Sequence, residues 1–331
     1  MERKKNQWIG WVYLLPAIIL MLVFTVFPLV VTIIIAFRNE FSMGYGLAQL
    51  IKPVNPTVGV REYWVGLNYG FGAFKELFTK QPDFWQYHFP NTLIIVFVSV
   101  PLTITLSLMI AVALNSIKKL QKFFQTIFFM PYVTNSIALG MVFAVMFGSN
   151  PNGLLNSLII GGGQTAINWL GDSLSSSASP AMIRFTGMTV LIIYIVWQAL
   201  PFKILILLSG LQGIDKQYYQ AAQIDGTSKF RTLMRITVPL LSPQIIYLMI
   251  TSFIGSFKEY NSVVAIFSQD GYPAGENIRE PYFGTIVLFI YQNMKALDKP
   301  HVAAAAAVIL FLIILLFTAL NSWISNKFVH Y

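Results

Sequence analysis

Charged side chains inside apolar stretches are the residues of this sequence best placed to do chemistry. Lys203 lies in one apolar run, and Lys258, Glu259 and Asn261 lie in another. A charged group in a membrane span is costly and is kept where it meets a partner, a cavity or water. We expect Glu259 to form a structural ion pair with a lysine, for which Lys203 is a candidate. We expect Lys258 and Asn261 to line a polar cavity.

The sequence lacks the groups that most enzymes and metal sites need. It has no cysteine, which excludes disulfides, thiolate metal sites and cysteine nucleophiles. His88, His301 and His330 are scattered, without the spacing of metal ligands. No G-x-x-x-x-G-K-[ST] phosphate loop occurs, so we do not expect the chain to hydrolyse ATP itself. We expect no catalytic residue, no metal and no enzyme activity of this chain alone.

The composition is that of a polytopic membrane protein. Of 331 residues, 56% are hydrophobic and 11% are charged, and the apolar residues fall in long runs. A soluble chain of this length cannot bury so many such runs. A net charge of +9 could indicate a nucleic-acid partner. The positions of the basic residues along the chain instead indicate the topology of a membrane protein. We therefore predict an all-α polytopic fold.

Apolar runs predict six membrane-spanning helices. The first is too long for a signal peptide and lacks a small-residue cleavage site, so we interpret it as a retained span. After it, Phe71, Phe74 and Phe78 fall on one face of a short amphipathic helix, at the outer membrane surface or packed beneath the bundle. We expect Pro131 to break the third span. The expected spans are 8–37, 90–114, 123–147, 184–211, 240–267 and 301–324.

Six spans place both termini on one side of the membrane, and the basic residues indicate which side is cytoplasmic. Basic residues outnumber carboxylates on the side of the termini and balance them on the other side. The basic side holds Arg3, Lys4, Lys5, Lys118, Lys119, Lys122, Lys216, Lys229, Arg231, Arg235 and Lys327, against Glu2, Asp215 and Asp225. The predicted parts are a cytoplasmic N-terminus with the first span (1–37), an extracytoplasmic segment (38–88), a core of five spans (89–326) and a cytoplasmic tail (327–331).

The stretch Tyr218–Pro239 is long, polar and basic, with apolar runs on both sides. Gly226 can adopt the left-handed conformation that ends a helix, and Thr227 or Ser228 can cap the next helix. Proline is tolerated in the first turn of the span that follows. We predict two short helices hinged at Gly226, which form either a handle for a soluble partner or an ordinary cytoplasmic loop.

Three short motifs of this region resemble the EAA loop of binding-protein-dependent ABC importer permeases. They are Gln220-Ala221-Ala222, Asp225-Gly226-Thr227-Ser228 and Ile236-Thr237-Val238-Pro239-Leu240-Leu241-Ser242-Pro243. The chain departs from the family in having Gln220 where Glu is usual and Asp215 where Ile-Pro is common. The resemblance implies the type I importer permease fold with six transmembrane helices, and a coupling loop over 216–238 that docks an ATPase.

The resemblance also implies which residues of this coupling loop meet the ATPase. Arg231 and Arg235 would add charge contacts. The apolar side chains that would fill a cleft of the ATPase are those of Tyr219, Ala222, Phe230 and Met234. Replacement of the usual Glu by Gln220 leaves the docking role in place. The implied residues are Tyr219, Gln220, Ala221, Ala222, Asp225, Gly226, Phe230, Arg231, Met234 and Arg235.

Four further motifs are similar to the carbohydrate subfamily of these permeases, of the maltose type. They are Trp85, Asn91-Thr92-Leu93, Phe128-Phe129-Met130-Pro131 and Asp270-Gly271-Tyr272-Pro273, the last where Gly-Gly-Pro is usual. In that subfamily the sugar is held midway through the membrane. The corresponding positions here are Tyr132, Ser136, Gln198, Ala199, Phe202, Lys258 and Asn261. Aromatic faces stack on sugar C–H surfaces, and polar groups hydrogen-bond to hydroxyls. Because Lys258 stands where that subfamily has Asn, we hypothesise an anionic cargo.

The resemblance implies an ATP-driven importer in the inner membrane of a bacterial or archaeal cell, with both termini of this chain cytoplasmic. Its partners would be a second homologous permease, an ATPase dimer that binds ATP and Mg, an extracytoplasmic solute-binding protein, a sugar and membrane lipid, but no nucleic acid. The alternative is a secondary transporter that couples to ions through Lys203, Lys258 and Glu259. This alternative gives no reason for the coupling loop. A third alternative, a membrane scaffold that transports nothing, explains neither the coupling loop nor the charged residues inside the spans.

Overall fold

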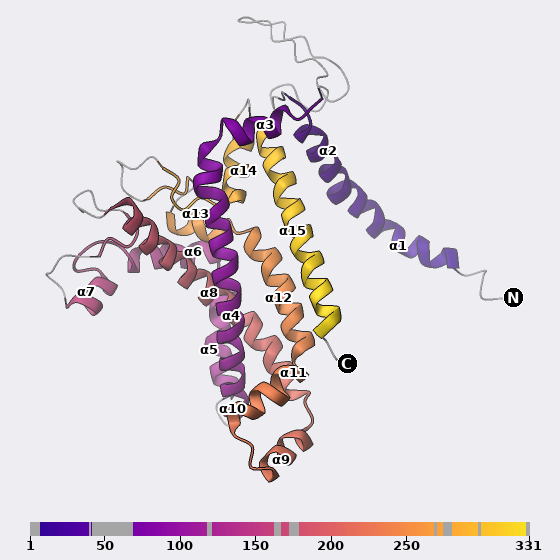
Figure 1. Cartoon of the computed structure of the whole chain (residues 1–331), viewed down its shortest axis with the longest axis vertical. Coiled ribbons are helices and arrows are strands. Elements are labelled where there is room, and N and C mark those ends of the chain that lie inside the picture. Colours follow the sequence, from indigo (N-terminus) through magenta and orange to yellow (C-terminus); the bar gives the residue numbers. More distant parts are fainter. Residues whose placement is uncertain are drawn as a thin grey trace, which may run out of the picture. The chain divides into compact units, whose positions relative to one another are not determined.

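The named secondary-structure elements in the part that the computed structural model describes are all helices (Figure 1). That part comprises residues 7–39, 41, 69–117, 121–161, 167–171, 179–267, 270–273, 280–296 and 299–328. The predicted all-α fold is confirmed. Parts of the predicted features lie outside these ranges, among them residues 1–6, 42–68 and 329–331, and Lys118 and Lys119. The chain divides into unit 1 (Met1–Pro82 with Ile290–Phe311) and unit 2 (Asp83–Phe289 with Leu312–Tyr331).

In unit 1 the first predicted span is a long helix. It consists of α1 (Gln7–Met21), a π-helical turn (Leu22–Val26) and α2 (Phe27–Ala36). The stretch Gly10–Ala36 is long and apolar enough to cross a membrane. Proline occurs inside α1 and in the first turn of α2. The predicted extent of this span is therefore confirmed.

The predicted amphipathic helix of unit 1 forms as α3 (Gly72–Thr79). Ala73 and Leu77 are its buried face, whereas Phe71 and Phe78 are exposed. Phe71 precedes the helix and packs with Phe37 at a ring-centroid distance of 5.5 Å. Of the two predicted placements, exposed phenylalanines fit a helix at the membrane surface better than one packed beneath the bundle.

In unit 2 the second and fourth predicted spans are α4 (Phe89–Ser116), preceded by a π-helical turn (Phe84–His88), and α8 (Pro180–Gln212). These two long helices make the most extensive helix–helix contact of the chain. An apolar cluster that includes Ile95, Tyr194 and Phe267 joins α4 and α8 to α13. A second cluster includes Leu207 and Leu248. The α4–α8 pair is the support on which the remaining elements of unit 2 pack.

The third predicted span is two helices, α5 (Gln121–Val133) and α6 (Ser136–Met146), which meet at an angle of 96°. Pro131 lies inside α5, so the break comes after the predicted proline. Asn135 caps α6, because its side-chain oxygen accepts hydrogen bonds from the amides of Ile137 and Ala138. Such a cap replaces the helical hydrogen bonds that are lost at the break.

The fifth predicted span ends earlier than expected. The structure has α12 (Ser242–Phe257), a break at residues 258–260, and α13 (Asn261–Phe267). The prediction of one continuous helix over 240–267 that contains Lys258 and Glu259 is therefore wrong. Before α12, the segment Lys229–Leu240 joins it at an angle of 71°. It contains α10 (Lys229–Thr232), a π-helical turn (Leu233–Thr237) and α11 (Val238–Leu240), whereas α9 (Lys216–Ile224) comes earlier.

The sixth predicted span is α15 (Pro300–Phe328). Two helices were not predicted, α7 (Leu154–Ile160) and α14 (Ile286–Lys295). Within the described ranges, four helices are long and apolar enough to cross a membrane, or up to six if each bent pair counts as one span. The upper number matches the six predicted spans.

The contact between α6 and α13 requires a small residue at position 140. A methyl group added to Gly140 would overlap the side chain of Ala265. We expect Gly140→Ala to lower stability by about 1–3 kcal/mol, the usual cost of overpacking a filled core. Ala265→Gly in the same chain should restore the space and most of the stability. Thermal unfolding of the purified variants, followed by tryptophan fluorescence, tests this, and a single variant as stable as the parent would contradict it.

Candidate functional site

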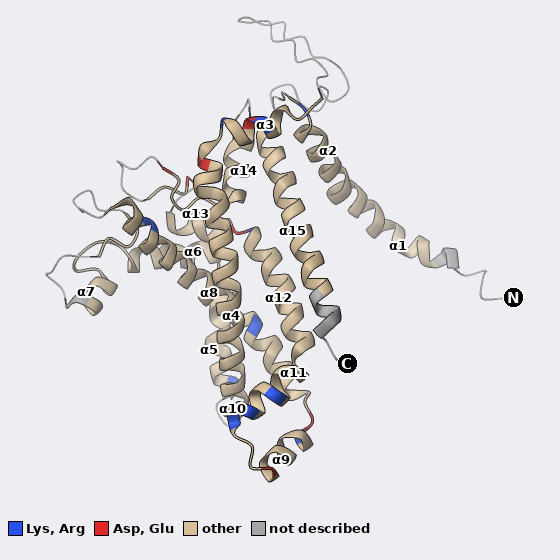
Figure 2. Cartoon of the chain, in the orientation of Figure 1, with Lys and Arg blue, Asp and Glu red and all other residues tan. Residues whose placement is uncertain are grey.

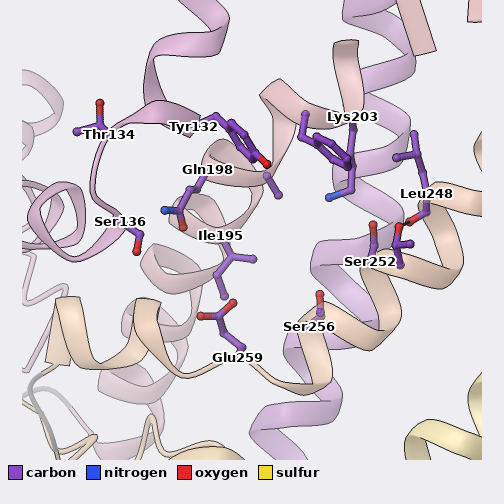
Figure 3. A pocket seen from close by; sticks show the side chains of 14 residues that line it. Tyr132, Thr134, Ser136, Ile195, Gln198, Lys203, Leu248, Ser252, Ser256 and Glu259 are labelled. Carbon is purple, nitrogen blue, oxygen red and sulfur yellow. Dashed lines mark hydrogen bonds between the residues drawn. The ribbon is translucent and has the colours of Figure 1, made fainter. Parts of the chain in front are cut away.

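A polar cavity of about 510 Å³ lies in unit 2 among the α5–α6 break, α8 and α12 (Figure 3). Its volume is in the range of small-molecule sites, about 300–1,000 Å³. Hydroxyl, amide, amine and carboxylate groups occur side by side in its lining. The lining residues are Tyr132, Thr134, Ser136, Ile195, Gln198, Ala199, Phe202, Lys203, Leu248, Thr251, Ser252, Gly255, Ser256 and Glu259.

The α5–α6 break forms one wall of the cavity. Thr134 and Ser136 flank the capping residue Asn135, so the turn of the chain brings both to the cavity. Next to them the rings of Tyr132 and Phe202 are stacked, with centroids 5.8 Å apart and planes 14° apart. This pair joins the end of α5 to α8 and offers an aromatic face beside the polar groups.

The opposite wall comes from α12. Leu248, Ser252 and Ser256 recur every fourth residue and so lie on one helix face. Gly255 adds no side chain there, and Thr251 uses its hydroxyl to donate to the carbonyl of Tyr247 at 2.8 Å. The serines are therefore the polar groups that α12 offers to an occupant of the cavity.

Five of the seven predicted substrate residues line this cavity, namely Tyr132, Ser136, Gln198, Ala199 and Phe202. Lys258 and Asn261 do not line it. Lys258 is exposed after the end of α12, and Asn261 opens α13. The anionic-cargo hypothesis, as based on Lys258, has no support from this placement. Sequence reasoning missed the contributions of Thr134, Thr251, Ser252 and Ser256, although the four-residue recurrence of serines in an apolar run is visible in the sequence.

Lys203 and Glu259 both line the cavity, but they form no ion pair in the described part of the chain. The Glu259 carboxylate instead accepts a hydrogen bond from the amide of Ser262 at 3.0 Å. Its backbone carbonyl accepts one from the Thr285 hydroxyl at 2.8 Å. Glu259 thus holds the start of α13, and the interpretation of a Lys203–Glu259 pair is not confirmed.

The Asn91-Thr92 motif has a structural role next to this site. Asn91 Nδ2 donates to the carbonyl oxygens of Tyr282 and Gly284 at 2.8 and 3.0 Å. Its Oδ1 accepts from Arg184 Nη2 at 2.7 Å. The Thr92 hydroxyl accepts from the amide of Ile286 at 3.0 Å. We call residues 280–286 the latch segment, because these bonds tie it to α4 and, through Asn91, to Arg184 of α8.

The latch segment is held at its first residue too. The hydroxyl of Tyr87 donates to the Glu280 carboxylate at 2.6 Å. This hydrogen bond, together with one from Tyr282, lowers the pKa of Glu280 below its ordinary value. Glu280 is therefore ionised at neutral pH, and its bond to Tyr87 is charge-assisted. Through Thr285 and Glu259, the latch segment is connected to the cavity wall.

The coupling loop forms the predicted pair of helices at one end of unit 2 (Figure 1). Asp215 caps α9 through the amide of Gln217, and Gly226 follows α9 with φ of +64°. Of the two predicted caps of α10, Ser228 is the one whose side chain accepts a hydrogen bond, from the amide of Arg231. The predicted helix–turn–helix is confirmed. The following α11 and α12 each carry proline in the first turn, as predicted.

Among the apolar residues predicted to meet an ATPase, two are exposed and two are not. Phe230 is 69% exposed and Met234 is also exposed, whereas Ala222 is buried. Tyr219 is half-buried, with its hydroxyl 3.2 Å from that of Thr237. Tyr219 and Ala222 therefore stabilise the loop from within. The most exposed large apolar residue of α9 is Ile224, which is 87% exposed and was not predicted.

The polar residues predicted in the coupling loop lie on its surface. Basic residues gather on and around α10 (Figure 2). This arrangement leaves a surface that combines cationic side chains with exposed Ile224, Phe230 and Met234. The exposed polar and small residues are Gln220, Ala221, Asp225, Arg231 and Arg235.

Comparison with known proteins identifies the family. Residues 103–330 match the family described as binding-protein-dependent transport system inner membrane component. The chain is 26% identical to the arabinooligosaccharides transport system permease protein AraP of Bacillus subtilis, over 96% of this chain and 88% of that protein. It is 28% identical to the lactose transport system permease protein LacF of Rhizobium radiobacter, over 90% of this chain and 87% of that protein.

A solved structure shares the fold. A chain of a bacterial alginate ABC transporter, in complex with an alginate pentasaccharide-bound periplasmic protein, superposes with a TM-score of 0.74 over 98% of this chain and 96% of that chain, at 20% identity. The expected type I permease fold is thereby confirmed. Because the family match spans most of the sequence and includes the coupling loop, the chain belongs to the family of inner membrane components of binding-protein-dependent transport systems.

Proposed function

We propose that this chain is a transmembrane permease subunit that moves an oligosaccharide or related sugar through the cavity of Figure 3. The observation that carries the proposal is the composition of the cavity. A stacked Tyr132–Phe202 pair offers a face for sugar C–H groups, and Gln198, Ser252 and Ser256 offer hydrogen bonds to hydroxyls. The named cargoes of two relatives, arabinooligosaccharides and lactose, support a sugar.

The coupling loop would be the point at which ATP hydrolysis acts on this subunit. A partner ATPase dimer would carry ATP and Mg, and it would dock on the surface made by Ile224, Phe230, Met234 and the basic residues around α10. A second homologous permease would complete the pathway, and an extracytoplasmic solute-binding protein would deliver the sugar. Closure of the ATPase dimer would push the two coupling loops together and turn the cavity outward.

The same proposal sets the topology. Basic residues gather around α10, the end of unit 2 that carries the coupling loop, and a basic excess is typical of the cytoplasmic side. Both termini would be cytoplasmic, in the inner membrane of a bacterial or archaeal cell. The ion-coupled alternative used Lys203, Lys258 and Glu259. It is less favoured, because Glu259 caps α13, Lys258 lies off the cavity, and the family match concerns binding-protein-dependent transport.

A pull-down in mild detergent tests this function. The tagged chain, purified from its host membranes, should retain a second permease and an ATPase in a stable complex. Its ATP hydrolysis should rise severalfold when a solute-binding protein loaded with sugar is added. Recovery of the folded, monodisperse chain alone would contradict the proposal and favour the ion-coupled carrier.

A further inference from the structure

We propose that Lys203 forms an anion subsite in the cavity, and that the sugar it helps to translocate is acidic, with a carboxylate that binds the Lys203 amine. The inference rests on the proposed function and adds the chemical class of the cargo. It replaces the role that Lys258 was given from the sequence.

Lys203 is buried in α8, with only 8% of its surface exposed. Its neighbours on the helix, Ile204, Leu207 and Leu208, belong to an apolar cluster. The amine reaches the cavity, where Figure 3 shows it directed toward the space between Tyr132 and Ser252. A cation held inside a membrane protein is costly unless it meets an anion or water.

No described side chain neutralises this amine. Lys203 makes no ion pair with a described carboxylate. The Lys203 amine is not among the described buried polar atoms that lack a hydrogen-bond partner, and the residue lines the cavity. The amine is therefore open to the cavity rather than sealed in the protein. The cation is available to an occupant of the cavity.

The other charge in the cavity is already engaged. Glu259 is fixed by the amide of Ser262 at the start of α13, and Thr285 holds its backbone. Figure 3 places the Glu259 carboxylate away from Lys203, on the far side of the space that Gln198 and Ser256 border. Moving this carboxylate to Lys203 would break the cap of α13. Glu259 is thus a structural anion and leaves the cation to the cargo.

The groups around Lys203 match the surface of a uronic acid residue. A uronate presents a carboxylate, several hydroxyls and a C–H face. The cavity offers an amine, the hydroxyls of Ser252 and Ser256, and the stacked pair of Tyr132 and Phe202. A neutral sugar would satisfy the hydroxyls and the aromatic pair but leave the amine without a counter-charge. A uronic-acid oligosaccharide satisfies all three.

The test compares two lysine variants in the assembled complex. Complexes with wild-type chain, Lys203→Met or Lys258→Met are reconstituted in liposomes with saturating solute-binding protein. The probes are trisaccharides of galacturonic, mannuronic and glucuronic acid, each with its carboxyl-reduced neutral counterpart. Uptake and stimulated ATP hydrolysis are measured for each pair. The ratio of acidic to neutral uptake isolates the permease, because the binding protein is the same in all complexes.

We expect wild-type chain to transport an acidic probe, and Lys203→Met to lower the acidic-to-neutral uptake ratio at least tenfold. Lys203→Arg should keep most of the ratio, since it keeps the charge. Lys258→Met is the matched control and should leave the ratio unchanged, because Lys258 is exposed outside the cavity.

Four results would overturn the inference. If the wild-type complex transports only neutral probes, the cargo class is wrong while the sugar permease stands. If Lys203→Met lowers acidic and neutral uptake equally, Lys203 is not an anion subsite. If Lys203→Met releases the second permease on size-exclusion chromatography, Lys203 pairs with a carboxylate of that subunit instead. If no probe of either kind stimulates the complex, the proposed function itself fails.

Discussion

Replacement of Gly226 by valine is expected to reduce ATP-driven transport more than tenfold while the chain still inserts into the membrane. Gly226 has φ of +64° and terminates α9 at the hinge of the coupling loop. In this region an ordinary L-residue costs about 1–2 kcal/mol, and a β-branched one costs more. Nothing lies within 4 Å of an added Cβ, so the expected effect arises from the backbone rather than from a clash.

The hinge conformation matters because two hydrogen bonds depend on it. The amide of Gly226 donates to the carbonyl of Gln223 at 3.1 Å, and the amide of Thr227 donates to that of Ala222 at 2.9 Å. A residue that leaves the left-handed region would lose this closure and change the direction in which α10 follows α9. Ile224 and Phe230, on either side of the hinge, would then no longer present one surface to the ATPase.

A graded series at this position separates backbone strain from other effects. Asparagine tolerates the left-handed region better than alanine does, and alanine better than valine. Transport should fall in the order Gly, Asn, Ala, Val. Gly161→Val is a matched control. Gly161 also has a positive φ, +80°, and open space around an added Cβ, but it follows α7, away from the coupling loop.

Two measurements on proteoliposomes decide the outcome. Sugar uptake per ATP hydrolysed reports coupling, and co-purification reports docking of the ATPase. Gly226→Val with uptake and docking equal to wild type would show that the hinge angle is not required. A similar loss in Gly161→Val would show that the effect is general strain rather than uncoupling.

The coupling loop could be predicted from sequence because local rules decide its shape. A glycine stops α9, a serine three residues before an amide donor caps α10, and prolines open the helices that follow. None of these features requires a distant partner. The long spans followed from hydropathy for the same reason, since a lipid environment requires a run of apolar residues.

The break after α12 could not be predicted in the same way. The run from Leu240 to Phe267 is apolar enough to suggest one helix, but two contacts from outside it decide the fold. Thr285 binds the backbone of Glu259, and Ala265 packs against Gly140 of α6. Thr285 and Gly140 are distant in sequence from the break, so the hydropathy of the 240–267 run cannot indicate these contacts. Because of this break Lys258 lies outside the cavity, and the lysine that lines the cavity is Lys203 instead of the predicted Lys258.

The prediction of the cavity residues likewise succeeded where local sequence decides the structure and failed where distant packing decides it. Tyr132, Gln198 and Phe202 line the cavity, and they lie next to helix breaks or prolines that sequence reveals. Ser252 and Ser256 were missed, because which face of α12 turns to the cavity depends on how α12 packs on α4 and α8. Helix periodicity gives the spacing of a face but not its direction.

Replacement of Asn91 by leucine is expected to destabilise unit 2 by roughly 2–4 kcal/mol, since single side-chain hydrogen bonds contribute about 0.5–1.5 kcal/mol and those to charged groups more. Asn91 is fully buried and makes three hydrogen bonds. Leucine fills a similar volume but leaves the carbonyl groups of Tyr282 and Gly284 without donors. It also leaves the Arg184 guanidinium without an acceptor.

The variants around Asn91 distinguish the network from simple packing. Asn321→Leu is the matched control, because Asn321 makes a single bond from α15, to the carbonyl of Phe317 at 3.0 Å. It should cost well under half as much. Combining Asn91→Leu with Arg184→Leu should cost less than the sum of the single variants, since the double variant no longer strands the guanidinium. The measurement is thermal unfolding followed by tryptophan fluorescence. Because the chain has no cysteine, disulfide formation cannot complicate the unfolding curve.

The Asn91 variant should also alter transport, which would show that the latch segment affects the cavity as well as stabilising the fold. Loss of its bonds frees the segment that carries Thr285, which holds the backbone of Glu259 at the cavity wall. We therefore expect Asn91→Leu to raise the sugar concentration needed for half-maximal stimulated ATP hydrolysis severalfold, at a temperature where the complex is still folded. Thr285→Val should reproduce that shift with a smaller loss of stability, because it removes the bond to Glu259 and leaves Asn91 in place. Unchanged sugar dependence in both variants, with stability lost only in the first, would limit the latch segment to a structural role.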